Sequence, residues 1–362
     1  MTLPSFGHVL SMSDHLGMFE HADHAEPRLA HGYCTDDVAR LLIVIVREPE
    51  RSEAVRELGR TALRFVVAAQ DATGRVRNRR DARGRWHGRR GVEDCWGRSI
   101  WAFGSAANRA SEEWMRSSGR AHFAHGARQR SPHRRAMAFA GLGAAEMLER
   151  DLRDQRARDL LSDAVTAIGS PSRDGGWAWP EARLSYANAA LPEVLIAAGH
   201  LLHRPDVLDD GQFLLGWLLD HETAGDHLSP TPVGGAAPGH PQPAFDQQPI
   251  EVAAMADACA RAHAVTGDDR WRHGLDLSIG WFAGANDLGA VMWDPETGGG
   301  YDGLTASGPN LNQGAESTLA LISTMQLSSF RNEPQDAGQD LSRSSSAGNE
   351  TVAMLAPTSA KP

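Results

Sequence analysis

The stretch DDVARLLIVIVREPERSEAVRELGRTALRFVVAAQ, residues 36–70, indicates the fold of the chain. Apolar residues recur at helical spacing on both sides of Pro49-Glu50-Arg51. This pattern predicts helices over residues 36–48 and 52–70, joined by a short polar turn. Two helices connected in this way form a helical hairpin.

The same periodicity recurs along the rest of the chain, and no alternating strand pattern competes with it. Further helices are predicted over residues 95–110, 134–150, 152–168, 185–202, 207–220, 249–265, 269–282 and 315–327. The first helices of successive pairs start near Asp36, Cys95, Arg134, Ser185, Pro249 and Ala315, about 40 to 65 residues apart. A helix pair that recurs at this period is typical of a solenoid or a closed toroid. Six starts indicate six hairpins, although the second and sixth outer helices are poorly defined.

Composition sets the domain organisation and excludes several classes of protein. We expect residues 1–330 to form one (α/α)6 toroid domain. A typical domain has about 150 residues, but toroids of this kind exceed 300 residues as single units. Residues 331–362 are rich in Ser, Gln, Asn, Asp and Pro, which predicts a disordered tail. No run approaches the ~20 apolar residues of a membrane span, and the N-terminus lacks a secretory pattern. Three widely spaced cysteines favour a reduced, cytoplasmic protein.

The charge distribution argues against a nucleic-acid partner. The chain has 36 Lys and Arg residues against 46 Asp and Glu residues, a formal net charge of −10. Residues 75–90 are locally very basic, and nearly all positive charge in the chain is arginine. This segment is either a solvated face or an arginine-lined rim that grips an anionic or polyhydroxylated substrate.

The long connections between hairpins contain the residues that could carry chemistry. In a toroid these connections converge on one face, where a rigid scaffold can hold functional groups in a cleft. Acidic residues at or near the starts of first helices can act as general acid and base, although each could instead cap its helix. The catalytic candidates are Asp36, Asp37, Asp94, Asp246 and Glu316, with Glu181 next.

Aromatic and amide side chains in the same loops indicate a carbohydrate substrate. Tryptophan and tyrosine faces can pack on sugar rings, while polar groups bind the hydroxyls. The predicted substrate-binding residues are Tyr33, Trp96, Arg98, Trp177, Trp179, Asn188, Gln247, Glu251, Asp302, Asn312 and Gln313. No metal site is predicted, because the cysteines are single and no histidine pair has ligand spacing on a confident helix. No cofactor is predicted either, since Walker and dinucleotide motifs are missing.

Several of these loops resemble one known family. GYCTDDVAR (residues 32–40), EDCWGRSIWAFG (93–104), FDQQPIE (245–251) and NQGAEST (312–318) resemble a bacterial family with a six-hairpin glycosidase-like fold. Members of that family are often fused to, or encoded beside, retaining glycosyltransferases, so the resemblance implies an association with such an enzyme. Val38 and Ala187 depart from the family pattern, which has Asn and Asp there. The Asp36-Asp37 pair is also similar to the catalytic pair of endo-α-1,6-mannanases on this fold.

The sequence therefore predicts a glycoside hydrolase-like enzyme that acts on an oligosaccharide or glycoconjugate. One carboxylic acid would protonate the leaving oxygen, and a second carboxylate would activate water or attack the anomeric carbon. One alternative is a sugar epimerase or isomerase, which would place histidines in the deepest part of the cleft. Another is a non-catalytic glycan-binding module that serves a glycosyltransferase, with an aromatic cleft and no facing carboxylates.

Overall fold

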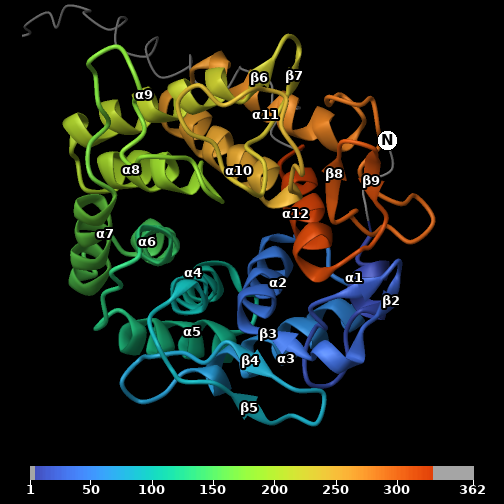
Figure 1. Cartoon of the computed structure of the whole chain (residues 1–362). Coiled ribbons are helices and arrows are strands. Elements are labelled where there is room, and N and C mark those ends of the chain that lie inside the picture. Colours follow the sequence, from blue (N-terminus) through green and yellow to red (C-terminus); the bar gives the residue numbers. More distant parts are fainter. Residues whose placement is uncertain (1–4, 329–362) are drawn as a thin grey trace, which may run out of the picture.

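Six helices form a closed inner ring in the computed structural model, which describes residues 5–328 (Figure 1). Each inner helix packs against the next one, and the last returns to the first. The inner helices are α2 (Thr35–Arg47), α4 (Asp94–Arg109), α6 (Arg134–Arg150), α8 (Ala190–Leu201), α10 (Pro249–Thr266) and α12 (Ala315–Gln326). This arrangement confirms the predicted all-α (α/α)6 toroid.

Outer helices cover the first five inner helices, each packing on the inner helix that precedes it (Figure 1). They are α3 (Glu53–Ala69), α5 (Glu113–Gly126), α7 (Gln155–Ile168), α9 (Pro205–His221) and α11 (Asp269–Phe282). Among the described residues no outer helix follows α12. The short helix α1 (Gly7–Ser11), from the other end of the chain, packs against α12 instead.

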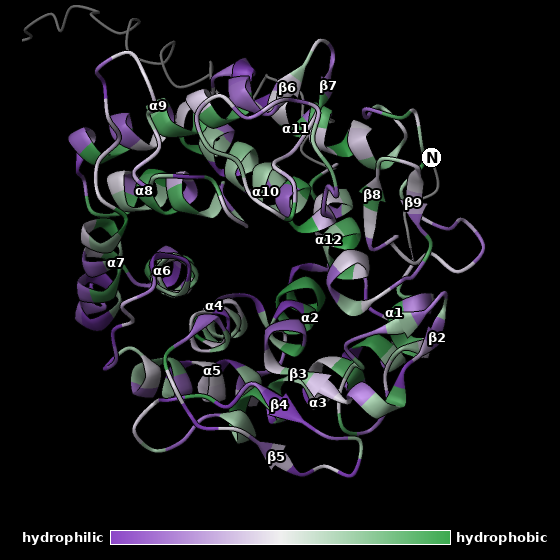
Figure 2. Ribbon diagram, viewed as in Figure 1, coloured by the Kyte–Doolittle hydropathy of each residue, from purple (hydrophilic) through white to green (hydrophobic). Residues whose placement is uncertain are grey.

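Burial explains why the two layers differ in sequence. Nearly every side chain of α4 and α6 is buried, because these helices have neighbours on all sides. The outer helices bury one face only, as the four buried residues of α5 illustrate. In Figure 2 the inner helices α2 and α12 are largely hydrophobic, whereas the strand β4 is hydrophilic. No helix among residues 5–328 has the length and apolar character needed to cross a bilayer.

Side-chain N-caps occur on three of the five outer helices and on none of the six inner helices. Ser52, Asp154 and Asp268 cap the outer helices α3, α7 and α11 with side-chain hydrogen bonds to backbone N–H groups. None of the six inner helices has a side-chain cap. Asp36 and Asp94 lie in the first turns of α2 and α4, so their carboxylates are not used for capping.

Short antiparallel strand pairs decorate the loops. They are β1 (Ala22–Asp23) with β2 (Glu26–Pro27), β3 (Tyr33–Cys34) with β4 (Arg79–Arg80) and β5 (Trp86–His87), β6 (Thr223–Ala224) with β7 (His227–Leu228), and β8 (Gly303–Thr305) with β9 (Gly308–Asn310). The pairing of Tyr33 with Arg80 brings the arginine-rich segment, residues 75–90, next to the start of α2. The predicted tail, residues 331–362, lies outside the described residues.

Candidate active-site pocket

A pocket of about 560 Å³ opens at the N-terminal ends of the inner helices. Its acidic lining comes from six separated parts of the chain. The lining carboxylates are Glu20, Asp36, Asp37, Asp94, Asp246, Asp302 and Glu316. The convergence of loops that the toroid predicts therefore brings five of the six catalytic candidates to one pocket.

A second cavity, of about 620 Å³, lies at the opposite ends of the inner helices. Its charged groups are joined to one another: Arg47 to Asp257 at 2.8 Å, Arg261 to Glu193 at 3.0 Å and Arg109 to Glu146 at 2.8 Å. These pairs connect different inner helices and leave few charges free for a ligand. The pocket at the N-terminal ends is therefore the better candidate for chemistry.

Arg40 holds two of the predicted catalytic carboxylates. It donates from one terminal nitrogen to Asp37 Oδ1 at 2.5 Å and from the other to Glu316 Oε2 at 2.6 Å. The two carboxylates, from the first turns of α2 and α12, thus bind to different nitrogens of one guanidinium group. This contact also joins the first and last inner helices at the point where the ring closes.

Among the carboxyl groups that line the pocket, Asp37 has a raised pKa, which favours a role as proton donor. Its pKa is raised to about 7, mainly by burial and also by the carboxylates of Glu316 and Glu20, while Arg40 opposes the shift. The neighbouring Asp36 is more exposed, at 15% of its side chain. Its Oδ2 accepts a weak hydrogen bond from the Cys34 thiol at 3.4 Å, and its Oδ1 has no hydrogen-bond partner.

Asp94 and Tyr186 meet at another part of the pocket lining. The Tyr186 hydroxyl donates a hydrogen bond to Asp94 Oδ2. Burial and this hydrogen bond raise the pKa of Tyr186, so the phenol stays protonated. Tyr186 is 40% exposed, which leaves part of its ring available to a ligand. Asp246 is also exposed in the pocket, whereas Asp302 accepts hydrogen bonds from the Gly314 N–H and the Ser317 hydroxyl.

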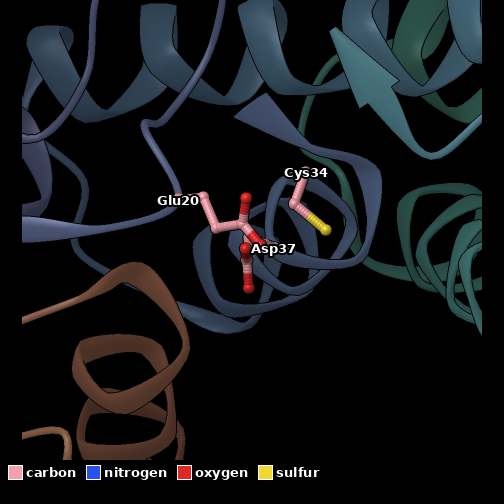
Figure 3. Close-up of side chains that lie close together, drawn as sticks. All are labelled: Glu20, Cys34 and Asp37. Atoms are coloured by element: carbon pink, nitrogen blue, oxygen red, sulfur yellow. The ribbon is translucent and has the colours of Figure 1, made fainter. Parts of the chain in front are cut away.

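Glu20, Cys34 and Asp37 could together hold a metal ion. Their ligand atoms lie within 4.8 Å of one another, and Figure 3 shows the two carboxylates next to each other with the Cys34 sulfur nearby. In this structure Glu20 is paired with Arg79 and Asp37 with Arg40. Burial and the carboxylates of Asp37 and Asp36 raise the pKa of Cys34, which favours the neutral thiol. The expectation of no metal stays a prediction.

A buried clamp fixes the loop that carries Tyr186. Glu251 accepts hydrogen bonds from the backbone N–H groups of Ala187 at 2.5 Å and Asn188 at 3.2 Å. Arg135 donates to the Tyr186 carbonyl at 3.0 Å and to the Asn188 side chain at 2.9 Å. These bonds hold Ala187 at a φ of 43°, a conformation that a residue with a Cβ seldom adopts.

Several predicted substrate-binding residues do not line the pocket, because they are buried or used by other protein groups. Tyr33 and Trp96 are fully buried, and they donate to Asp14 and to the Gly126 carbonyl. The indole N–H groups of Trp177 and Trp179 donate to Glu181, and both rings pack against Trp217. The expectation that tryptophan faces form the sugar subsites is therefore corrected: these four aromatic residues belong to the core or to the loop packing.

The other predicted residues that lie outside the pocket also form hydrogen bonds with protein groups. Glu181 accepts from Arg135, and Asn188 and Glu251 belong to the clamp described above. Gln247 donates to Asp287, Asn312 accepts from the His24 N–H, and Gln313 donates to Asp294. Of the predicted substrate-binding group, Arg98 and Asp302 line the pocket.

Sequence reasoning missed Arg40 and Glu20, and it named Arg79 only as part of the arginine-rich segment, residues 75–90. Arg40 follows Asp37 by three residues, a spacing that places both on one helix face, so it could have been found. Glu20 lies in a segment without helical periodicity, and no local signal connects it to Asp37. Arg79 reaches the pocket through the pairing of β4 with β3, which the sequence does not reveal.

No family model and no curated protein matches this chain. Its fold is similar to that of a sugar epimerase from a ruminal bacterium, with 11% identity and a TM-score of 0.67 over 91% of this chain and 96% of that chain. It is also similar to cellobiose 2-epimerase from Spirochaeta thermophila, with 13% identity and a TM-score of 0.64 over 89% and 93%. A third similar structure is an α-1,6-mannanase of Salegentibacter, with 8% identity and a TM-score of 0.60 over 90% and 96%. These solved structures are carbohydrate-processing enzymes, and at such identities the likeness shows a shared (α/α)6 fold.

Proposed function

We propose that this protein is a glycoside hydrolase-like enzyme that acts on an oligosaccharide or glycoconjugate, with Asp37 as general acid and Asp36 as its partner carboxylate. The observation that supports this assignment is the unequal environment of two adjacent carboxyl groups in the first turn of α2. Asp37 is buried and has a pKa raised to about 7, whereas Asp36 is more exposed to the pocket. A buried carboxyl group with a raised pKa is suited to donate a proton, and a more exposed neighbouring carboxylate can take the partner role.

In this mechanism Asp37 donates its proton to the glycosidic oxygen as the bond from that oxygen to the anomeric carbon breaks. The Asp36 carboxylate accepts a proton from water, and the water oxygen forms the new bond to the anomeric carbon. The products are a reducing sugar and an alcohol. Arg40 keeps Asp37 and Glu316 in place through its two hydrogen bonds.

The lining of the pocket favours hydrolysis over epimerisation. A sugar epimerase needs a base next to the substrate carbon, and histidines would then line the deepest part of the cleft. Among the described residues, His21 is the one histidine that lines the pocket, and its side chain is 49% exposed. The carboxylates of Asp36 and Asp37 lie closer to the core. The likeness of the fold to epimerases does not by itself favour that reaction.

A non-catalytic glycan-binding module is also less well supported. That function predicts an aromatic cleft without facing carboxylates, whereas the tryptophans considered above lie outside the pocket and seven carboxylates line it. An association with a glycosyltransferase and a cytoplasmic location are further parts of the proposal, and both rest on the sequence.

A screen for released reducing sugar tests the proposed activity directly. We expect the wild-type protein to hydrolyse at least one member of an oligosaccharide panel. Asp37→Asn and Asp36→Asn should each lower kcat by about 10²- to 10⁴-fold, the usual effect of removing an acid or base. Asp159→Asn, on the exposed side of α7, is the matched control and should retain wild-type activity. Equal activity of all four proteins on a hydrolysed substrate would show that the assignment is wrong.

A further inference from the structure

Arg98 occupies an unusual position at the inner end of the pocket. Its side chain is 4% exposed, and it lines both the pocket and a narrow channel of about 50 Å³ that continues between the inner helices. One face of its guanidinium group stacks on Phe139, with the central carbon 3.9 Å from the ring centroid. The edges of the guanidinium group are therefore what remains for a ligand.

Arg98 differs from the other two arginines of the pocket in having no hydrogen-bond partner. Arg40 binds Asp37 and Glu316, and Arg79 binds Glu20. Within residues 5–328 the side chain of Arg98 makes no hydrogen bond, and its closest ionic neighbour is Asp36, whose Oδ1 lies 3.8 Å from Nε. A buried guanidinium group without hydrogen bonds is costly, because its desolvation is not compensated.

The channel beside Arg98 contains further donors without acceptors. Arg40 and Trp101 line it, and Arg40 Nε and Trp101 Nε1 are buried without a hydrogen-bond partner. The two carboxylates that line the channel are already paired, Glu193 with Arg261 and Asp257 with Arg47. The inner end of the pocket thus offers donors, while the outer part offers carboxylate acceptors.

We propose that this inner end binds a carboxylate substituent of the sugar, so that the substrate is an acidic sugar of the uronate type. This inference rests on the proposed function and specifies its substrate. A guanidinium edge matches a planar carboxylate in two parallel hydrogen bonds. The channel is small, which favours a carboxylate over a bulkier phosphate group. The hydroxyl groups of the same sugar would donate to the carboxylates of the outer pocket.

Three of the seven carboxylates that line the outer pocket are paired with arginines, which reduces the repulsion that an anion would meet there. Arg40 compensates Asp37 and Glu316, and Arg79 compensates Glu20. Burial and the nearby Arg40 lower the pKa of Arg98 more than the carboxylates of Asp36, Glu316 and Asp94 raise it, so a counterion closer than the 3.8 Å of Asp36 would stabilise the cation. An anion at the guanidinium edge would supply one.

The test compares the affinities of the full chain for glucuronate, galacturonate, glucose, galactose and glucose 6-phosphate by titration calorimetry. We expect at least one uronate to bind at least tenfold more tightly than its neutral counterpart, the effect of one charge-assisted hydrogen bond. Arg98→Gln should abolish this preference, and Arg98→Lys should reduce it. Arg64→Gln, an exposed arginine of α3, controls for the loss of one positive charge and should keep the preference.

The outcomes separate this inference from the proposed function. Neutral sugars that bind as tightly as the uronates would overturn the inference and leave the hydrolase proposal intact. Tightest binding of glucose 6-phosphate would replace the carboxylate with a phosphate and also overturn it. A protein that binds none of these sugars would overturn the inference, whereas the hydrolase proposal is decided by the oligosaccharide screen. The wild-type comparison decides the question even if Arg98→Gln fails to fold, which circular dichroism would reveal.

Discussion

Asp37 shows how strongly the surroundings of one residue can change its chemistry. The carboxyl group follows Asp36 directly in the chain, yet burial and the nearby carboxylates raise its pKa to about 7. The rise means that the protonated form is favoured in the folded protein up to neutral pH. A general acid is useful only while it holds its proton, so the pKa of Asp37 should limit activity on the alkaline side.

We therefore expect kcat to fall as the pH rises through about 7, with Asp37 as the titrating group. Glu20→Gln removes one of the negative charges that raise the pKa of Asp37, so it should move this alkaline limb to lower pH. The measurement is a pH–rate profile of both proteins on the substrate found in the screen. Glu53→Gln, far from Asp37 on the exposed face of α3, should leave the limb in place. An alkaline limb that does not move in Glu20→Gln would contradict the role of Asp37.

Helices α4 and α6 pack closely where Gly104 of α4 faces Gly143 of α6. A Cβ atom added to Gly104 would lie 2.2 Å from the carbonyl oxygen of Gly143, which is backbone and cannot rotate away. Two inner helices can approach this closely only with glycine on the facing side.

Gly104→Ala should accordingly lower the free energy of unfolding by about 1–3 kcal/mol, the usual cost of overpacking a core. Alanine has a higher helix propensity than glycine by about 1 kcal/mol, and this gain would offset part of the loss caused by overpacking. Urea unfolding of both proteins gives the difference. Gly176→Ala, whose added Cβ would meet no atom within 4 Å, should stay within about 0.5 kcal/mol of wild type. A variant at Gly104 as stable as wild type would show that α4 and α6 can separate without cost.

How well the sequence predicted a helix depended on how many apolar residues that helix has. The inner helices were predicted well, because α6 is buried on nearly all sides and its apolar pattern is dense. The outer helix α5 was not defined, because it buries only Met115, Gly119, Phe123 and Gly126. Helix α8 begins at Ala190 rather than at residue 185, since the Glu251 clamp holds residues 187 and 188 in a loop.

The arrangement of the whole ring explains which site residues could be predicted. Carboxylates at the starts of inner helices could be assigned to one face, because a toroid brings those ends together. The tryptophans were misplaced because loop position does not reveal burial: Trp96 lies in the first turn of α4 and is fully buried. The contact of Arg40 with Glu316 depends on the closure of α12 against α2 and joins residues 276 positions apart, so no local pattern shows it.

The ring also buries carboxyl groups in a way that should make the stability of the whole molecule depend on pH. Burial raises the pKa of Asp37 and Glu222 to about 7 and that of Glu251 to about 8. The folded protein therefore binds more protons than the unfolded chain between about pH 4 and pH 8, and its stability falls as the pH rises through this window. Buried His8 and His122, whose pKa values are lowered, oppose the trend below about pH 6.5. Exposed carboxylates such as Glu113, with a pKa lowered to about 2, lose their contribution to stability in acid.

Together these shifts predict maximum stability near pH 5 to 6 and a lower melting temperature at about pH 8. Glu222→Gln provides the decisive comparison. Its amide oxygen can still accept hydrogen bonds from Thr231, as the carboxyl group does now, but it cannot ionise. The variant should match wild type near pH 5 and be more stable at pH 8, because it removes a buried charge and relieves Glu251, whose pKa Glu222 helps to raise. Calorimetric melting curves of both proteins across this range provide the measurement. A wild-type protein that melts at a higher temperature at pH 8 than at pH 5.5 would contradict this prediction, because it would show that the folded protein stabilises the charged form of these buried carboxyl groups.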